Sequence, residues 1–349
     1  MLVSTRFVTI RDLQKALSQE ASGVEALVHC QLAHIRSAQT RSGKPYYRLR
    51  VTDAQDGIDL NAWNDTAAYA AVENKLVSEA DFIELRGVFS KNDRGLNVQD
   101  IALRQLTDEE KTTLLNGSSE RSADLDKWET ELVEAIEAME DPLLKTLSNK
   151  IFSKTRVRFR RAAAAFKVHH ARRGGLLEHT ASMLRLAKAL GGCYPDANLD
   201  LIVFGILFHD SGKTIQCDVE EGFAAQASLT GELVGHVALG TLIVSTTLVE
   251  ILQADKALLA GRSFEEVRAH ILHVILAHHG TNEHGSPVEP QTLEALIVHS
   301  IDSLDAHAEI MRAAWLAADP NANLIDAPRP LKGKLARSLK RIAAGESAN

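Results

Sequence analysis

The sequence contains little cysteine and no long uninterrupted apolar run near its middle. Its three cysteines, Cys30, Cys193 and Cys217, form no CxxC pair and cannot build a dense disulfide framework. The longest apolar run near the middle of the chain, residues 201–208, is far shorter than the roughly 18 residues of a membrane span. The opening MLVSTRFVTI lacks a basic stretch followed by an apolar one, which argues against a secretory signal. These absences predict a cytoplasmic protein without a membrane partner.

The chain also lacks a large charge of either sign. Its 39 Lys and Arg residues and 46 Asp and Glu residues leave a formal net charge of −7. This balance excludes a uniformly basic nucleic-acid coat protein and a disordered acidic chain. Hydrophobic residues make up 45% of the 349 residues and charged residues 24%, which is enough apolar material for sizeable cores. At roughly 150 residues per domain, this length predicts two domains.

The first hundred residues have the pattern of a β-domain. Five strand-length segments with partial period-2 alternation are separated by turns that contain Gly, Asn and Asp. An Ala-rich segment between the third and fourth strands, residues 66–77, is predicted to be helical. Five strands with a helix after the third are the element order of an OB-fold, and any other small β-barrel is the alternative. The domain spans residues 1–106, and its predicted strands are residues 24–38, 46–53, 58–64, 82–90 and 96–104.

Most of the remaining chain is predicted to be helical. Residues 107–124 are polar and are predicted to link the two domains. The fold class is therefore multidomain α and β: a five-stranded OB-fold barrel is followed by an all-α domain over residues 125–320. A basic C-terminal helix or tail covers residues 321–349. Helices are predicted at about residues 126–140, 143–168, 175–191, 199–210, 230–254, 263–279, 291–318 and 330–343.

Histidine is concentrated in the helical part of the sequence. Of the 14 histidines, 12 lie between residues 169 and 307. Imidazole and carboxylate groups are ligands of first-row divalent metals, and four or more on adjacent helices can surround two ions. A carboxylate shared by two ions would place a hydroxide between two Lewis acids. A single histidine is more often a core or surface residue, but a metal centre is predicted by the ordered set His179, His209-Asp210, His236, His278-His279 and Asp302.

This order of residues resembles the HD-domain superfamily of metal-dependent phosphohydrolases. Longer strings resemble the YhaM-type 3′–5′ exoribonucleases in particular, which pair an N-terminal OB-fold with a C-terminal HD domain. The resemblance covers roughly residues 24–315. It is carried by SGKPYYRLRVTDAQDGIDLNAW in the barrel and by HHARRGGLLEHT, LFHDSGK, GELVGH, AHHG and TLEALIVHSIDSLDAH in the helical part.

The resemblance implies a role for each residue of the ordered set. One metal site would be formed by His179, His209, Asp210 and Asp302. Asp210 would bridge to a second ion held by His236 and His278. His279 would either complete this second site or contact the phosphate or leaving group. Asp305, one turn after Asp302, is an alternative ligand.

Asp210 and Lys213 are the expected catalytic residues. Lys213 would neutralise charge that grows on the phosphoryl oxygens, and the alternative is a solvated lysine at a helix end. A bridging metal-bound hydroxide would attack the terminal phosphodiester. Manganese is the first expectation for the two divalent ions, although His and Asp ligands also accept Fe, Co, Ni, Zn or Mg.

The activity implied by the resemblance is removal of nucleotides from the 3′ end of single-stranded RNA as nucleoside 5′-monophosphates. Single-stranded DNA is an alternative substrate, and the family also implies a homo-oligomer. One rival function is an HD-class hydrolase of a small nucleotide, with the OB-fold as a regulatory or oligomerising module. Another is a nucleic-acid-binding protein whose HD site is inert.

Basic residues near the expected ligands are candidates for contact with the substrate. Residues 145–173 contain ten Lys or Arg and no acid, and residues 329–341 contain six. Such patches gain affinity for polyphosphate chains by displacing counterions, and the alternative is a solvated helix face. We expect residues 145–173 to face the substrate. Within them, His170, Arg172 and Arg173 could reach a phosphate or ribose, or they could form a capping and turn segment.

The barrel offers aromatic and basic residues that suit single-stranded nucleic acid. OB surfaces stack bases on aromatic rings above a positive groove. Alternation along the second strand places Tyr47 inward and therefore Tyr46, Arg48 and Arg50 outward. These three residues are the expected RNA contacts on the barrel, whereas Trp63 is expected in the core.

Overall fold

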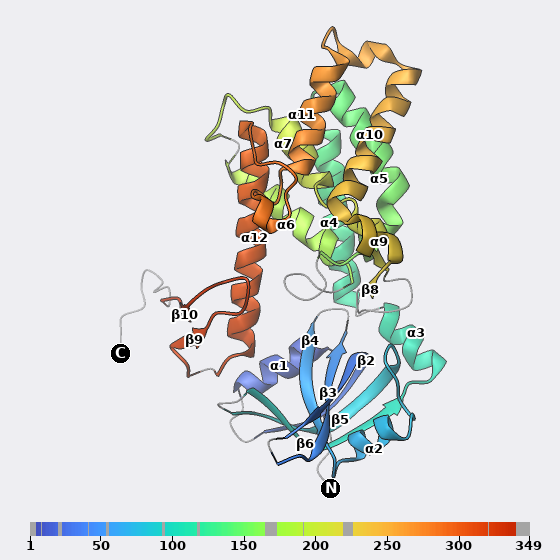
Figure 1. Cartoon of the computed structure of the whole chain (residues 1–349), viewed down its shortest axis with the longest axis vertical. Helices are drawn as coiled ribbons and strands as arrows, with labels where there is room; N and C mark the ends of the chain where they lie inside the picture. Colours follow the sequence, from blue (N-terminus) through green and yellow to red (C-terminus); the bar gives the residue numbers. More distant parts are fainter. Residues whose placement is uncertain are drawn as a thin grey trace.

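The computed structural model describes residues 5–7, 9–19, 23–40, 42–53, 56–92, 95–116, 119–164, 173–190, 192–218, 226–319 and 321–339. Figure 1 shows a β-domain and a helical domain stacked along the long axis, connected through α3 (Asp108–Asn116) and α4 (Ser119–Glu137). The long helix α12 (Leu293–Ala317) runs from the helical domain to the β-domain, where it contacts α1 (Ile10–Gln19). The domains are therefore held together by a packing contact as well as by the chain.

The β-domain is an open, OB-like barrel with the element order predicted from the sequence. Its strand order is β4-β3-β2-β5-β6, and the short β1 (Thr5–Phe7) lies parallel to β2. β2 pairs with β5 through residues 24–31 and with β3 through residues 31–39. The edge strands β4 and β6 contact each other without a hydrogen-bonded ladder, and α2 (Ala67–Glu73) packs against both. The main strands are β2 (Val24–Gln39), β3 (Pro45–Thr52), β4 (Gly57–Trp63), β5 (Phe82–Asn92) and β6 (Gly95–Gln105).

A buried carboxylate anchors α1 to this barrel. Asp53 follows β3 and accepts hydrogen bonds from the backbone N–H groups of Ile10 and Asp56. The bond to Ile10 satisfies one of the N–H groups that the start of a helix leaves without a partner. Neither β1 nor α1 is among the elements predicted from the sequence.

The predicted linker over residues 107–124 is helical from residue 108 onward where the structure describes it. α3 begins with a capping box, in which the Thr107 hydroxyl accepts a hydrogen bond from the backbone N–H of Glu110. The Glu110 carboxylate in turn accepts a hydrogen bond from the backbone N–H of Thr107. The polar residues therefore stabilise a helix start, and their composition does not mark an irregular segment.

The helical domain is built around the apolar helix α7 (Leu199–Phe208). This helix contacts α4, α6, α11 and α12 as well as α5, and Phe204, Ile206 and Phe208 are fully buried. Because α7 is covered on most sides, its sequence is a continuous apolar run and not an amphipathic stripe. The surrounding helices are α5 (Pro142–Arg161), α6 (Gly175–Leu190), α8 (Lys213–Gln216), α9 (Leu229–Val234), α10 (His236–Ala254) and α11 (Phe264–Leu276). Short elements complete the domain: β7 (Cys217–Asp218), β8 (Gln226–Ala227), η1 (Lys256–Leu259) and η2 (Asn282–His284).

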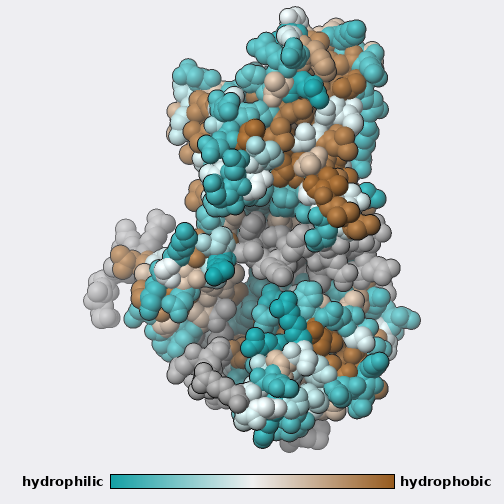
Figure 2. All heavy atoms as spheres, viewed as in Figure 1, coloured by the Kyte–Doolittle hydropathy of each residue, from teal (hydrophilic) through white to brown (hydrophobic). Residues whose placement is uncertain are grey.

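Among the described residues, α10 is the one helix long and apolar enough to cross a membrane. It packs against α5 and α11, and its Val244 and Leu248 are fully buried, as in the core helix of a packed domain. α9 instead exposes Leu229 and Leu233, and Figure 2 shows apolar surface in this part of the helical domain.

The basic C-terminal segment is not helical where it is described. The prediction of a helix over residues 330–343 is wrong for residues 330–339, because β10 (Lys334–Ala336) pairs with β9 (Leu324–Asp326) in an antiparallel hairpin. Residues 340–343 lie outside the described residues. Pro330 and Gly333 lie just before β10, and both residue types disfavour a helix interior. The buried Leu335 and the Arg337 guanidinium, 4.5 Å from the Trp315 ring centroid, hold the hairpin against the domain.

Candidate metal centre

The seven residues expected as metal ligands lie together in the helical domain. α6 carries His179, the segment that follows α7 carries His209 and Asp210, and α10 begins with His236. The turn after α11 carries two more, and α12 carries the last. In this order they are His179, His209, Asp210, His236, His278, His279 and Asp302.

One half of the cluster is the His179 site, by which we mean His179, His209, Asp210 and Asp302. A nitrogen of His179, a nitrogen of His209 and an oxygen of Asp210 all lie within 4.8 Å of one another. Asp302 Oδ1 is 3.2 Å from His179 Nε2. Both imidazoles and Asp210 are buried, so little water competes for these atoms.

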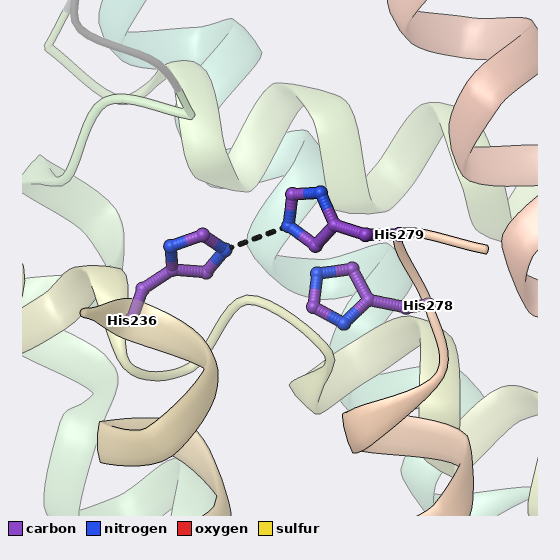
Figure 3. Close-up of side chains that lie close together, drawn as sticks. All are labelled: His236, His278 and His279. Atoms are coloured by element: carbon purple, nitrogen blue, oxygen red, sulfur yellow. Dashed lines mark hydrogen bonds between the residues drawn. The ribbon is translucent and has the colours of Figure 1, made fainter. Parts of the chain in front are cut away.

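The other half is the His236 site, formed by His236, His278 and His279. One nitrogen of each ring lies within 4.8 Å of the others. Figure 3 shows His236, from the start of α10, pointing toward His279, with the two Nε2 atoms 3.0 Å apart. The structure therefore brings His279 to this site together with His278.

The Asp210 carboxylate lies between the two sites. Its Oδ2 is 3.3 Å from His209 Nε2, whereas its Oδ1 is 3.3 Å from His236 Nε2 and 3.7 Å from His278 Nε2. Lys213 Nζ contacts Asp210 Oδ2 at 2.5 Å. One carboxylate thus faces nitrogen atoms of both sites, which is the arrangement that a bridging ligand requires.

The hydrogen bonds of two buried rings, His209 and His278, leave a nitrogen lone pair on each that can bind a cation. Nδ1 of His209 lies 2.9 Å from the carbonyl oxygen of Ile206, and Nδ1 of His278 lies 2.6 Å from that of Ile275. A carbonyl oxygen only accepts, so Nδ1 carries the hydrogen and Nε2 presents a lone pair. Both Nε2 atoms and Asp210 Oδ1 are buried without a hydrogen-bond partner among the described residues. Converging acceptors of this kind fit a bound metal ion.

The electrostatics of the cluster keep four of the candidate ligands, His236, His278, His279 and Asp210, in the forms that bind metal. Burial lowers the pKa of His278 and His279, and burial together with Lys213 lowers the pKa of His236 to about 4. Burial opposes ionisation of Asp210, but Lys213 and His209 hold its pKa well below the usual range. These imidazoles are therefore neutral and this carboxylate charged near neutral pH, as metal ligation requires.

His179 differs from the other rings because it lies between two carboxylates. Asp302 faces its Nε2, and Asp305 Oδ2 is 2.7 Å from its Nδ1. Burial lowers the pKa of His179, but the two carboxylates outweigh burial and raise it to about 9. Asp305 thus contacts the far side of the ring and does not take the position of Asp302.

Two close backbone approaches shape the cluster. A Cβ at Gly212 would lie 1.9 Å from the carbonyl oxygen of His236, so only glycine allows the HD segment to pack against the start of α10. Gly280 has φ +83°, and a Cβ there would lie 2.3 Å from the ring of His299. His299 Nδ1 is 2.7 Å from the carbonyl oxygen of His278, so this ring supports the turn that carries both histidines. Neither His299 nor the contact of Asp305 is assigned by the sequence pattern.

Five of the eight basic residues of the run that the structure describes pair with acids of neighbouring helices. Lys145 pairs with Glu137 of α4, Lys150 and Lys154 pair with Glu250 of α10, and Arg156 and Arg160 pair with Glu129 of α4. These five side chains are paired with acids of neighbouring helices, and a substrate-facing role for residues 145–173 stays a prediction. His170 and Arg172 lie outside the described residues. Arg173 lies two residues before α6 and is half-buried, and burial lowers its pKa.

On the barrel, the outward face of β3 differs from the prediction in one residue. Tyr46 is only 7% exposed, so its prediction as an open contact is wrong. Its ring lies 4.8 Å from that of Trp63, which is 37% exposed and therefore does not belong to the core. Arg48 is exposed and lies 5.8 Å from the Tyr46 ring centroid, whereas Arg50 pairs with Asp59 at 2.8 Å.

The strand register adds a residue that the sequence pattern does not identify. Arg36 of β2 lies directly opposite Arg48 of β3, and both are exposed. Like charges directly opposite each other destabilise a sheet unless an anion neutralises them. Arg36, Arg48 and Trp63 thus place two cations and an open aromatic ring on one stretch of the β2–β3–β4 surface.

The comparisons with known proteins agree with this geometry. The HD domain family matches residues 176–307, the segment that contains the seven clustered residues. The 3′-5′ exoribonuclease YhaM of Geobacillus sp. (strain WCH70) is 30% identical over 314 residues, which cover 88% of this chain and 90% of the relative. The match therefore includes the barrel as well as the helical domain. The chain belongs to the YhaM-type family of HD-domain 3′–5′ exoribonucleases.

Proposed function

We propose that this protein is a metal-dependent exoribonuclease that shortens single-stranded RNA from its 3′ end and releases nucleoside 5′-monophosphates. Single-stranded DNA is the alternative substrate. The observation that carries the proposal is the Asp210 carboxylate, which faces nitrogen atoms of two buried sites in a member of the YhaM-type family. The resemblance also favours a cytoplasmic homo-oligomer, and both remain predictions.

The two sites would hold two divalent ions, with manganese as the first expectation. The His179 site supplies two imidazoles and two carboxylates, and the His236 site supplies three imidazoles. Bound there, the ions would polarise a phosphoryl oxygen and lower the pKa of a coordinated water.

The protein's own residues hold this chemistry in place. The Nδ1 contacts to Ile206 and Ile275 keep the His209 and His278 lone pairs directed into the cluster. Lys213 keeps Asp210 ionised, and its side chain is 12% exposed beside the same carboxylate. An ammonium with three N–H donors can contact Asp210 and also stabilise negative charge on a phosphoryl oxygen.

On the barrel, we propose that Arg36, Arg48 and Trp63 hold the RNA strand. A phosphate between the two guanidiniums would remove their repulsion, and a base would stack on the exposed indole. This set replaces the expectation based on Tyr46, whose ring is covered by Trp63.

The first experiment is incubation of the full chain with Mn²⁺ and a single-stranded RNA labelled at its 5′ end. We expect a ladder that shortens from the 3′ end. In Asp210→Asn we expect the rate to fall by on the order of 10³-fold or more, because both sites lose their shared charge. Asp196→Asn, which changes an exposed carboxylate, is the matched control and should retain full activity.

Intact RNA alongside hydrolysed mononucleotides would favour the small-nucleotide hydrolase instead. RNA cleavage that persists in a pure Asp210→Asn preparation would contradict the metal centre as the site of the reaction.

A further inference from the structure

The His179 site has an acidic residue behind it that is not one of the expected ligands. Asp305 lies on α12, one turn after Asp302, and is 5% exposed. Its Oδ2 is 2.7 Å from His179 Nδ1, and its Oδ1 accepts a hydrogen bond from the hydroxyl of Ser182. Ser182 lies on α6, close to one turn after His179, so α6 and α12 together enclose this carboxylate.

The three buried histidines of the cluster differ in what lies behind them. His209 and His278 direct Nδ1 at neutral carbonyl oxygens, whereas His179 directs Nδ1 at a carboxylate. A carboxylate is a stronger acceptor than a carbonyl, and it raises the basicity of the nitrogen that faces a metal. In the part of the chain that the structure describes, Nδ1 of His236 and His279 has no hydrogen-bond acceptor.

The distribution of negative charge also favours tighter cation binding at the His179 site than at the His236 site. The His179 site contains Asp302 in addition to the shared Asp210, with Asp305 in contact with its histidine. The His236 site consists of three imidazoles with the shared Asp210 beside it, and Asp302 of the other site acts on His278 and His279 electrostatically without belonging to this site. A divalent cation therefore meets more negative charge at the His179 site than at the His236 site.

We propose that Asp305 is a positioning residue that, with Ser182, fixes the orientation of His179 and makes the His179 site the tighter of the two ion sites. Asp305 does this through the ring and not by direct ligation, because the opposite nitrogen faces the cluster. This inference rests on the metal centre of the proposed function.

The test is titration of the metal-free full chain with Co²⁺, followed by calorimetry and by the visible absorption of bound Co²⁺. We expect two binding events of different affinity in the wild-type protein. Asp305→Asn, which keeps an acceptor but removes the charge, should weaken the tighter event by about 10-fold. Asp305→Ala also removes the acceptor and should weaken it by up to about 100-fold. The weaker event should stay unchanged in both variants.

Two further variants separate positioning from general destabilisation. Ser182→Ala removes only the hydroxyl that contacts Asp305, so it should weaken the tighter event by less than Asp305→Asn does. It decides the question if the Asp305 variants do not fold, as judged by circular dichroism. Asp53→Asn removes a carboxylate that is equally buried but lies in the barrel, and it should change neither event.

Unchanged affinity of the tighter event in the folded variants, or equal weakening of both events, would overturn the role of Asp305. Absence of Co²⁺ binding to the wild-type chain would overturn the metal centre itself, and with it the proposed function. The role of Asp305 as a positioning residue is supported if only the tighter binding event is weakened. The loss of affinity should then be largest in Asp305→Ala, smaller in Asp305→Asn and smallest in Ser182→Ala.

Discussion

At the scale of single residues, the hydrogen-bond partner of each histidine decides what that histidine can do. His209 and His278 are held by main-chain carbonyls, His179 by Asp305, and His236 by His279. The two carbonyl contacts determine that Nε2 of His209 and of His278 presents a lone pair. The number of histidines in a segment therefore says less about metal binding than the position of the groups behind their rings.

A prediction at this scale concerns Gly280, which allows the His299 ring to lie against the turn that carries His278 and His279. Gly280→Ala should lower the free energy of unfolding by more than Gly261→Ala, although φ is +83° at both positions. Gly261 has open space around it, so its alanine variant should lose only about 1–2 kcal/mol of stability to left-handed backbone strain. In Gly280→Ala the displaced His299 adds a steric cost and should also weaken metal binding.

Denaturant unfolding of both variants, with metal titration alongside, measures this difference. Equal losses of stability and intact metal binding in the two variants would show that His299 does not support the turn.

At the scale of elements, the helices supply partners for charges that the sequence presents as one run. Glu129 of α4 is 6% exposed and contacts both Arg156 and Arg160 of α5. The arginines therefore join two helices, although an acid-free basic stretch is typical of a nucleic-acid surface. Helical geometry directs neighbouring residues to different faces, so the charges of one run meet different neighbours.

We expect Glu129→Gln to lower the free energy of unfolding by about 1–2 kcal/mol, because it weakens charge-assisted hydrogen bonds at a buried carboxylate. Asp126→Asn, at a side chain that is 68% exposed and also contacts Arg160, should change stability by less than about 0.5 kcal/mol. Thermal unfolding of the two variants tests the pairing. RNA affinity should be the same in both, and a clear gain in affinity for Glu129→Gln would place these arginines on the substrate surface.

At the scale of the whole molecule, the candidate metal-binding residues and the candidate RNA-binding residues lie in different domains. The candidate metal ligands all lie in the helical domain, and the exposed Arg36, Arg48 and Trp63 lie on the barrel. The contact between α1 and α12 joins the barrel to the helix that carries Asp302 and Asp305. Under the proposed function, the barrel would hold the RNA strand and the helical domain would cleave it.

The corresponding prediction is a loss of affinity that depends on RNA length. Trp63→Ala should weaken binding of long single-stranded RNA by roughly 10-fold, since one stacking interaction contributes about 1–3 kcal/mol. Arg36→Ala with Arg48→Ala should reduce the slope of log affinity against log salt by about 1 for each phosphate that the variant no longer binds. Cleavage of a dinucleotide, which under this proposal contacts only the metal centre, should be unaffected.

Arg86→Ala, which removes an exposed arginine from β5, is the matched control and should leave RNA affinity unchanged. Equal losses on long RNA and on dinucleotides in the barrel variants would remove this face from the path of the substrate.

The sequence by itself determined the five strands with a helix after the third, the helical second domain, and the identity and order of the clustered metal-binding residue types. These features depend on periodicity and on spacing along the chain, which local backbone geometry translates directly into structure. The polar composition around Thr107 did not reveal the helix start within the linker, and the segment around Pro330 was wrongly predicted to be a helix.

Only the tertiary structure decided which groups meet across the chain. Asp305 meets His179 from 126 residues away, Glu250 meets Lys154 from 96 residues away, and Trp63 covers Tyr46 through strand pairing. Such contacts depend on how helices and strands pack against one another, and no local pattern encodes that packing. The residue types of the metal centre can therefore be read from the sequence, but the difference between its two sites follows only from the packing of α6 against α12.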